Sequence, residues 1–172
     1  VTGRAMGIGG SVGRREATGR GVVTCVREAC RELGIPLEGA CVAIQGYGNV
    51  GATAARIAHE AGAHVVALSD VNGGIHDPRG LDLAKVDAWV REHRTLSGFP
   101  GADALSNAEL LGLECDVLIP AALENQITEE NCDRIQAKIV GEGANGPTTA
   151  VAGDRLYARG VVGLPGMVLD GG

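Results

Sequence analysis

The 172-residue sequence predicts an α/β fold, a doubly wound and mostly parallel sheet with helices on both faces. Three observations support this fold class. Short, almost wholly apolar runs alternate with longer amphipathic segments. One strand–helix–strand unit closes within about thirty residues, and parallel strands need a crossover of this kind. Polar or glycine-rich stretches follow the apolar runs, where ligands bind in open α/β sheets.

The first half of the chain begins with a glycine-rich stretch, residues 1–13, which we expect to be a loop. A helix should follow and end at Gly34 and Pro36. Its apolar residues recur at helical spacing and are Val22, Val26, Ala29, Cys30 and Leu33. Residues 40–45 then form a short apolar run that is typical of a strand buried on both faces. Residues 49–61 repeat the helical spacing, and residues 63–70 read as a second buried strand.

The middle of the chain changes from turn to helix twice. Residues 72–82 are rich in turn formers, and residues 83–94 show helical spacing. Ser106 and Glu109 have the spacing of a capping box, in which each side chain accepts from the backbone N–H of the other residue. This pair predicts the start of a short helix.

The last part of the chain continues the alternation. Residues 115–122 predict a strand, and Thr128 is a candidate cap for the next helix. A further strand should begin at residue 138, a helix should occupy residues 148–160, and residues 161–164 are a candidate last strand. The sequence shows neither an internal repeat nor a linker, so we expect a single domain over residues 1–172.

Composition excludes several classes of partner. The hydrophobic fraction is 45% and the net charge is −6, which favours a globular protein without a nucleic-acid surface. No apolar run approaches the length of a membrane span. The five cysteines show no C-x-x-C spacing and the four histidines show no metal-ligand spacing. We therefore expect reduced thiols in a cytoplasmic protein, and no metal site. Because the chain begins at Val1, we expect it to be a fragment.

A glycine turn follows the first buried strand. Gly46, Gly48 and Gly51 fit G-x-G-x-x-G, the pattern of a Rossmann-like dinucleotide site. The first glycine permits a tight turn, the second lets the backbone approach a pyrophosphate, and the third allows close helix–strand packing. Asn49 and Val50 open the following helix, whose N-terminal N–H groups favour phosphate. These five residues are the predicted phosphate-binding set.

Asp70 ends the second strand, 19 residues after Gly51. A carboxylate at this position can accept hydrogen bonds from the adenosine ribose of a dinucleotide. It should also repel a 2′-phosphate, which favours NAD over NADP, although a neighbouring arginine would reverse that preference. The alternative is a plain glycine turn followed by a solvated aspartate.

Several stretches resemble one family specifically. These are "GGSVGRREATGRG" (9–21), "VAIQGYGNVG" (42–51), "CDVLIPAALENQIT" (115–128) and "KIVGEGANGPTT" (138–149). They resemble the C-terminal coenzyme-binding domain of glutamate dehydrogenases, within the wider glutamate, leucine, phenylalanine and valine dehydrogenases. The resemblance implies reversible oxidative deamination of L-glutamate to 2-oxoglutarate and ammonia, with hydride passing to NAD or NADP. It also implies a homo-oligomer, commonly a hexamer.

The resemblance assigns further coenzyme contacts by position. Thr18 of "EATG" and Asn145 of "EGAN" match residues near the nicotinamide and its ribose. Asn49 matches the asparagine beside the glycine turn, and Ala121 and Ala122 of "PAAL" match the loop lining the coenzyme. From the residues alone, Thr18 is also a candidate cap for a helix beginning near Gly19. Asn145 precedes Gly-Pro and is equally a turn candidate.

The resemblance also indicates what this chain lacks. In the family, a separate substrate domain supplies lysines for substrate binding and catalysis. The sequence contains two lysines, Lys85 and Lys138, and neither lies in a matching motif. Residues 169–172 only partly match the family's Asn-Ala-Gly-Gly turn. We therefore expect coenzyme binding without turnover and predict no catalytic residue. A stand-alone dinucleotide-binding module and the domain of another amino-acid dehydrogenase are the alternatives.

Overall fold

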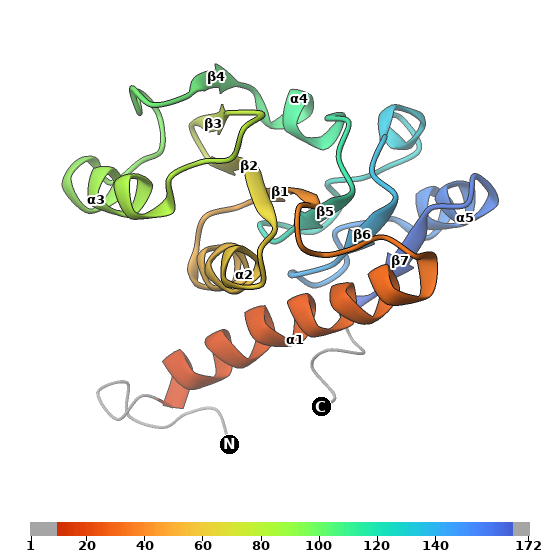
Figure 1. The fold of residues 1–172 in the computed structure, drawn as a ribbon. Coiled ribbons are helices and arrows are strands. Elements are labelled where there is room, and N and C mark those ends of the chain that lie inside the picture. The colour runs from red at the N-terminus through yellow and green to blue at the C-terminus, as the bar shows by residue number, and fades with distance from the viewer. Residues whose placement is uncertain (1–9, 167–172) are drawn as a thin grey trace.

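A computed structural model describes residues 10–166, with side chains from residue 16 onward. Seven strands form one sheet in the order β4-β3-β2-β1-β5-β6-β7 (Figure 1). The strands are β1 (Cys41–Gln45), β2 (His64–Asp70), β3 (Gly73–His76), β4 (Asp103–Leu105), β5 (Val117–Pro120), β6 (Ile139–Gly141) and β7 (Val162–Leu164). The helices are α1 (Gly10–Leu33), α2 (Asn49–Glu60), α3 (Leu83–His93), α4 (Asn107–Leu111) and α5 (Ala150–Ala158), with a 3₁₀ turn, η2 (Cys132–Arg134).

The sheet topology confirms the predicted fold class. Strands β2, β1, β5, β6 and β7 are parallel, and only β3 and β4 at one edge are antiparallel. From β1 the chain crosses through α2 to β2 on one side, and it later returns to place β5 on the other side of β1. The strand order therefore reverses between β1 and β5. In doubly wound sheets this reversal opens a crevice at the carboxyl ends of the strands.

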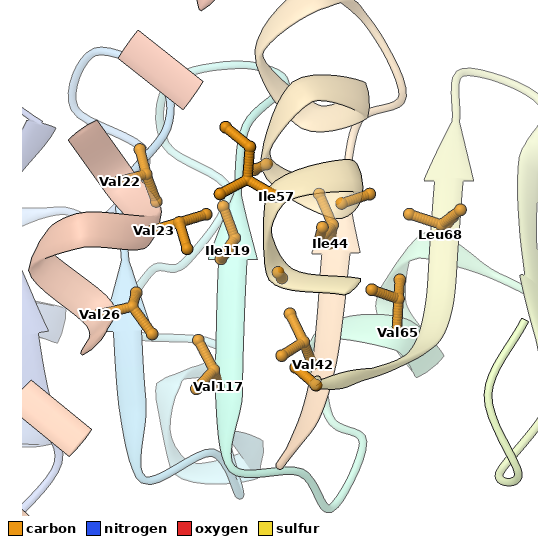
Figure 2. Packing of buried hydrophobic residues seen from close by; sticks show 14 of the residues in the cluster. Val22, Val23, Val26, Val42, Ile44, Ile57, Val65, Leu68, Val117 and Ile119 are labelled. Carbon is orange, nitrogen blue, oxygen red and sulfur yellow. The ribbon is translucent and has the colours of Figure 1, made fainter. Parts of the chain in front are cut away.

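One face of the sheet packs against α1 and α2. Their apolar stripes meet the side chains that alternate to this face of the strands (Figure 2). Val23 of α1 lies beside Ile119 of β5, and Ile57 of α2 lies near β1. Val22 and Val26 of α1 pack over Gly141 of β6, where a Cβ would lie 2.9 Å from Val26 and 3.4 Å from Val22. Each fully buried valine or isoleucine contributes about 1.5–3 kcal/mol relative to an exposed one. This packing fixes α1 across the central strands.

The other face is covered by α4, η2 and α5. Ala43, Leu118 and Val140 point to this face and pack with Leu110 and Leu156 of the helices. Strands β1, β5 and β6 are therefore buried on both faces, which is the physical reason for their unbroken apolar sequences.

Helix ends follow the local sequence signals. Gly34 lies at φ +71°, and the Gly34 and Ile35 N–H groups donate to the Arg31 and Cys30 carbonyls to end α1. The Ser106–Glu109 capping box is present at α4, which confirms its prediction. The carboxylate of Glu109 accepts from the Ser106 N–H, and this bond holds the pKa of Glu109 below its usual value.

The N-terminal helix is longer than predicted. Helix α1 begins at Gly10, so residues 10–13 are helical rather than a loop, whereas residues 1–9 lie outside the described part of the chain. Thr18 lies well inside α1 and is not a cap for a helix beginning at Gly19. One glycine of this helix, Gly19, lets α2 pack closely against it. A Cβ at Gly19 would lie 2.8 Å from Cβ of Thr53.

Two strands and one helix differ from the sequence prediction. Within the turn-rich segment 72–82, residues Gly73–His76 form β3, and β4 at Asp103–Leu105 was not predicted. Both are antiparallel edge strands of three or four residues, which carry little periodic signal. Between Thr128 and β6 the chain forms the 3₁₀ turn η2 in place of an α-helix, so the prediction of a helix capped by Thr128 is wrong. The Thr128 N–H donates to Asn131 Oδ1, which makes a side-chain-closed turn.

The cysteines are all free thiols, and Cys30, Cys115 and Cys132 are buried. Burial is the main cause that raises the pKa of Cys115 to about 12. Within residues 10–166 we find no cluster of histidine, cysteine, aspartate or glutamate suited to a metal ion. None of the described helices is long and apolar enough to cross a membrane.

Candidate functional site

The predicted site residues lie along the carboxyl edge of the parallel strands. Gly46 follows β1, Asp70 ends β2, Ala121 follows β5 and Glu142 follows β6. Backbone hydrogen bonds tie these loops together. The Gly46 N–H donates to the Ser69 carbonyl at 3.0 Å, and the Ala121 N–H donates to the Gln45 carbonyl at 2.8 Å. The glycine turn is therefore fixed between the ends of β2 and β5.

Each of the three turn glycines has a different environment. Gly46 lies at φ +98°, and a Cβ there would lie 3.0 Å from the backbone of Ala121. A Cβ at Gly51 would lie only 1.7 Å from the Gly46 carbonyl oxygen. At Gly48, in contrast, a Cβ would meet no atom of the described residues within 4 Å apart from its chain neighbours. The fold therefore requires glycine at positions 46 and 51, whereas Gly48 faces open space.

The N-terminus of α2 opens at this turn. Gly48 is the N-cap residue, and it has no side chain with which to cap the helix. The Ala52 N–H makes the first helical bond, to the Gly48 carbonyl at 2.8 Å. The N–H groups of Asn49, Val50 and Gly51 therefore precede the helical ladder. They lie at the positive end of the helix dipole, where an anion is favoured.

Tyr47 joins the glycine turn to α3. Its hydroxyl donates to the carboxylate of Asp87, 40 residues later. Burial, with a further contribution from this bond, raises the pKa of Tyr47 well above its ordinary value. Tyr47 also lines a pocket of about 580 Å³ between α2 and the start of α3. The sequence reading assigned no role to this tyrosine.

Asp70 is held by several hydrogen bonds from within the chain. Its Oδ1 accepts from the Asn72 N–H at 2.9 Å. Its Oδ2 accepts from the Thr95 hydroxyl at 3.0 Å and the Leu96 N–H at 2.7 Å. The Asn107 amide donates to the Asp70 carbonyl at 2.9 Å. The aspartate is therefore an ordered, partly buried group and not a freely solvated one.

Thr18 and Asn145 come together at a second pocket, of about 180 Å³. Its other lining residues are Glu142, Gly143, Ala144 and Gly166. Gly143 packs closely between this pocket and the glycine turn, since a Cβ there would lie 2.9 Å from Cβ of Ala121 and 3.2 Å from Val50. Asn145 is exposed in a bend before Gly146 at φ +54°, so it lies both in a turn and beside the pocket.

The structure thus gathers all ten predicted residues at one edge of the sheet. Ala122 also belongs there, because a Cβ at Gly46 would lie 3.0 Å from Cβ of Ala122. Their role as ligands stays a prediction. Residues 169–172, with the partial match to the Asn-Ala-Gly-Gly turn, lie outside the described residues.

Sequence reasoning missed Tyr47, Thr95 and Glu142. Tyr47 lies between Gly46 and Gly48, and this place inside the glycine motif is the one sequence feature that could have pointed to it. No sequence feature points to Thr95, because its contact with Asp70 joins positions 25 residues apart.

Neither lysine belongs to this edge. Lys138 immediately precedes β6, at the amino end of the strands, and its Nζ lies 3.2 Å from Asp116 Oδ1. Lys85 is exposed in the first turn of α3. The carboxyl edge therefore offers glycines, small polar groups and carboxylates, but no lysine. This set can hold an anionic, hydroxyl-rich ligand and contains no amine that could act as a base.

The model of the glutamate/leucine/phenylalanine/valine dehydrogenase family matches residues 9–172. The chain belongs to this family. Members of this dehydrogenase family among curated proteins include the glutamate dehydrogenase of Thermotoga maritima, which is 47% identical over the whole chain. The cryptic catabolic NAD-specific glutamate dehydrogenase of Bacillus subtilis is 45% identical. The chain spans 42% and 40% of the lengths of these two relatives.

Solved structures of the family share the fold. The hetero-hexameric glutamate dehydrogenase of Thermus thermophilus superposes with a TM-score of 0.84 at 32% identity, covering 92% of this chain and 37% of that one. The glutamate dehydrogenase of Peptoniphilus asaccharolyticus gives a TM-score of 0.76 at 34% identity, covering 98% of this chain and 39% of that one. The mixed α/β sheet described above is therefore the family's architecture.

Proposed function

We propose that this chain is the coenzyme-binding domain of an NAD-linked glutamate dehydrogenase. The observation that carries the proposal is the contrast among the turn glycines. Gly46 and Gly51 are required by protein contacts, whereas a Cβ at Gly48, in front of the helix N-terminus, would meet none of the residues that the structure describes beyond its chain neighbours. A glycine without a packing reason at that point is explained by a ligand whose phosphates approach the backbone.

The residues present fit a dinucleotide along the whole edge. The N–H groups of Asn49, Val50 and Gly51 would receive the pyrophosphate, and Asp70 would receive the adenosine ribose. Ala121, Ala122 and Gly143 carry small or no side chains and would line the path of the coenzyme between the turn and the second pocket. Thr18 and Asn145 would orient the nicotinamide end with neutral hydroxyl and amide groups. When bound, the nicotinamide supplies the hydride-accepting ring.

NAD is favoured over NADP in this proposal. Among the ion pairs described in residues 16–166, none neutralises Asp70. An uncompensated carboxylate at the ribose would repel a 2′-phosphate. Two relatives from Bacillus subtilis, at 45% and 43% identity, are named as NAD-specific enzymes. NADP remains the alternative coenzyme.

Turnover requires a catalytic base, and the described residues at the carboxyl edge of the sheet include no lysine that could act as one. A lysine base would need burial or charged neighbours to lower its pKa, and neither Lys85 nor Lys138 lines the pockets beside the glycine turn and Asn145. We propose that a substrate domain supplies these groups in the whole protein, which would act in the cytoplasm as a homo-oligomer. No nucleic-acid or membrane partner is proposed.

A second candidate is the equivalent domain of another amino-acid dehydrogenase. The L-tryptophan dehydrogenase of Nostoc punctiforme shares this fold with a TM-score of 0.69 at 26% identity. The fold is therefore found in enzymes named for different amino-acid substrates. A third candidate, a non-catalytic dinucleotide module, differs from both in having no substrate domain.

Calorimetric titration of the 172-residue chain with NAD, NADP and ADP-ribose tests the proposal. We expect binding of NAD and of ADP-ribose, with NADP binding more weakly. No detectable binding of any of the three at millimolar concentration would reject the coenzyme site. Glutamate-dependent formation of NADH by the purified chain alone would show that the missing groups are not needed.

A further inference from the structure

The hydroxyl of Thr95 has a fully determined orientation. A threonine hydroxyl has one donor and two acceptor positions. Its oxygen accepts from Nδ2 of Asn72 at 3.0 Å and from the Ser97 N–H at 3.1 Å. With both acceptor positions used, the O–H is left to donate, and it donates to Oδ2 of Asp70 at 3.0 Å.

The same loop fixes the carboxylate of Asp70 in a definite direction. Oδ2 accepts from both the Thr95 hydroxyl and the Leu96 N–H, which uses its two lone pairs. Among the residues that the structure describes, Oδ1 accepts from the Asn72 N–H alone, so one of its acceptor positions remains available. The loop after α3 therefore holds one oxygen of Asp70 and leaves one acceptor position on the other.

We propose that Thr95 is a positioning residue for coenzyme selection, because it holds one oxygen of Asp70 and so presents the other to a single ribose hydroxyl. The ligand class is a dinucleotide with a free adenosine 2′-hydroxyl, and a 2′-phosphate is excluded by the fixed negative charge. This inference rests on the proposed coenzyme site. It adds that selectivity depends on a loop 25 residues away from Asp70 in sequence.

The test compares Thr95→Val with Thr95→Ser. Valine keeps the shape and removes the hydroxyl, whereas serine restores the hydroxyl without the methyl group. For each variant, Kd is measured by calorimetry for NAD and NADP, and for ADP-ribose with and without a 2′-phosphate. In Thr95→Val we expect the ratio of the NADP Kd to the NAD Kd to fall about five- to tenfold. A change of this size corresponds to the net contribution of about one hydrogen bond. Thr95→Ser should restore the wild-type ratio.

A matched control is available in the same loop. Ser97 contributes only its backbone N–H to the network, and its side chain is exposed. Ser97→Ala should therefore leave the ratio unchanged. An equal weakening of NAD and NADP in Thr95→Val, or a ratio within twofold of wild type, would overturn the proposal, because a merely structural role alters both affinities together.

A double-mutant cycle shows whether Thr95 acts through Asp70. In an Asp70→Asn background, Thr95→Val should produce no further change in the ratio, and an additive change would refute the proposal. If Thr95→Val fails to fold by circular dichroism, Thr95→Ala gives the same comparison. A wild-type chain that binds none of the ligands rejects the coenzyme site itself. A wild-type chain that binds NAD while Thr95→Val keeps the ratio rejects only the role of Thr95.

Discussion

Substitution of Gly51 by alanine gives the sharpest test of the glycine turn. The new Cβ would lie 1.7 Å from the Gly46 carbonyl oxygen and 2.9 Å from its carbon. Real Cβ contacts stay beyond 3.0 Å, so α2 or the turn must move by at least about 1.3 Å. The turn is held by the Gly46 N–H bond to Ser69 and by contact with Ala121, so neither part can move freely.

We expect Gly51→Ala to lower the free energy of unfolding by about 2–4 kcal/mol, the upper part of the range for overpacking. The matched variant is Gly48→Ala. Its Cβ would have no neighbour within 4 Å among the described residues outside 47–49, and its φ is −86°, so the loss of stability should stay below about 1 kcal/mol. Its NAD affinity should nevertheless fall at least about tenfold, because the methyl group occupies the space of the pyrophosphate.

Both effects are measurable with the same preparations. Urea unfolding followed by circular dichroism gives the stability of each variant, and calorimetry gives the Kd for NAD. An unchanged unfolding midpoint for Gly51→Ala would refute the steric reasoning. Unchanged NAD binding by a stable Gly48→Ala chain would refute the placement of the phosphates at the turn.

Two further predictions concern ionisation. Because the pKa of Glu109 is lowered in the folded state, its capping bond stabilises the chain above its ordinary pKa of 4.5 and is lost as the pH falls below that value. The stability difference between wild type and Glu109→Ala, measured by urea unfolding from pH 7 to pH 3, should therefore shrink with acidification, and a constant difference would contradict the capping role. Since burial raises the pKa of Cys115 to about 12, this thiol should remain unmodified by iodoacetamide at pH 8 in the folded chain and react only in urea, as mass spectrometry of the peptides can show. Rapid labelling of Cys115 in the native chain would contradict its burial.

The central sheet was predictable because its signals are local. Strands β1, β2 and β5 are apolar runs, and α2 and α3 carry periodic apolar stripes whose spacing is set by the backbone itself. The glycine turn was predictable for a similar reason, since it joins a strand to a helix within a few residues. The Ser106–Glu109 capping box also acts over three residues, and it is present as expected.

Sequence patterns did not predict the elements whose structure depends on contacts with distant segments. The edge strands β3 and β4 exist because they pair with each other and with β2, and their own sequences are short and glycine-rich or polar. Helix α1 extends to Gly10 although a run of glycines disfavours it. The segment after Thr128 forms a side-chain-closed turn in place of the helix that its cap predicted.

The sequence by itself determined the central parallel strands, the glycine turn and the candidate aspartate, because these depend on side-chain spacing along one segment. Only the tertiary structure decided how that aspartate is held. Its two oxygens differ because Thr95 and Leu96 reach one of them from a loop 25 residues away, and hydrogen bonds between distant segments leave no periodic trace in sequence. The openness of the space before Gly48 is likewise a property of the packed structure alone, since it depends on which atoms of other segments come near.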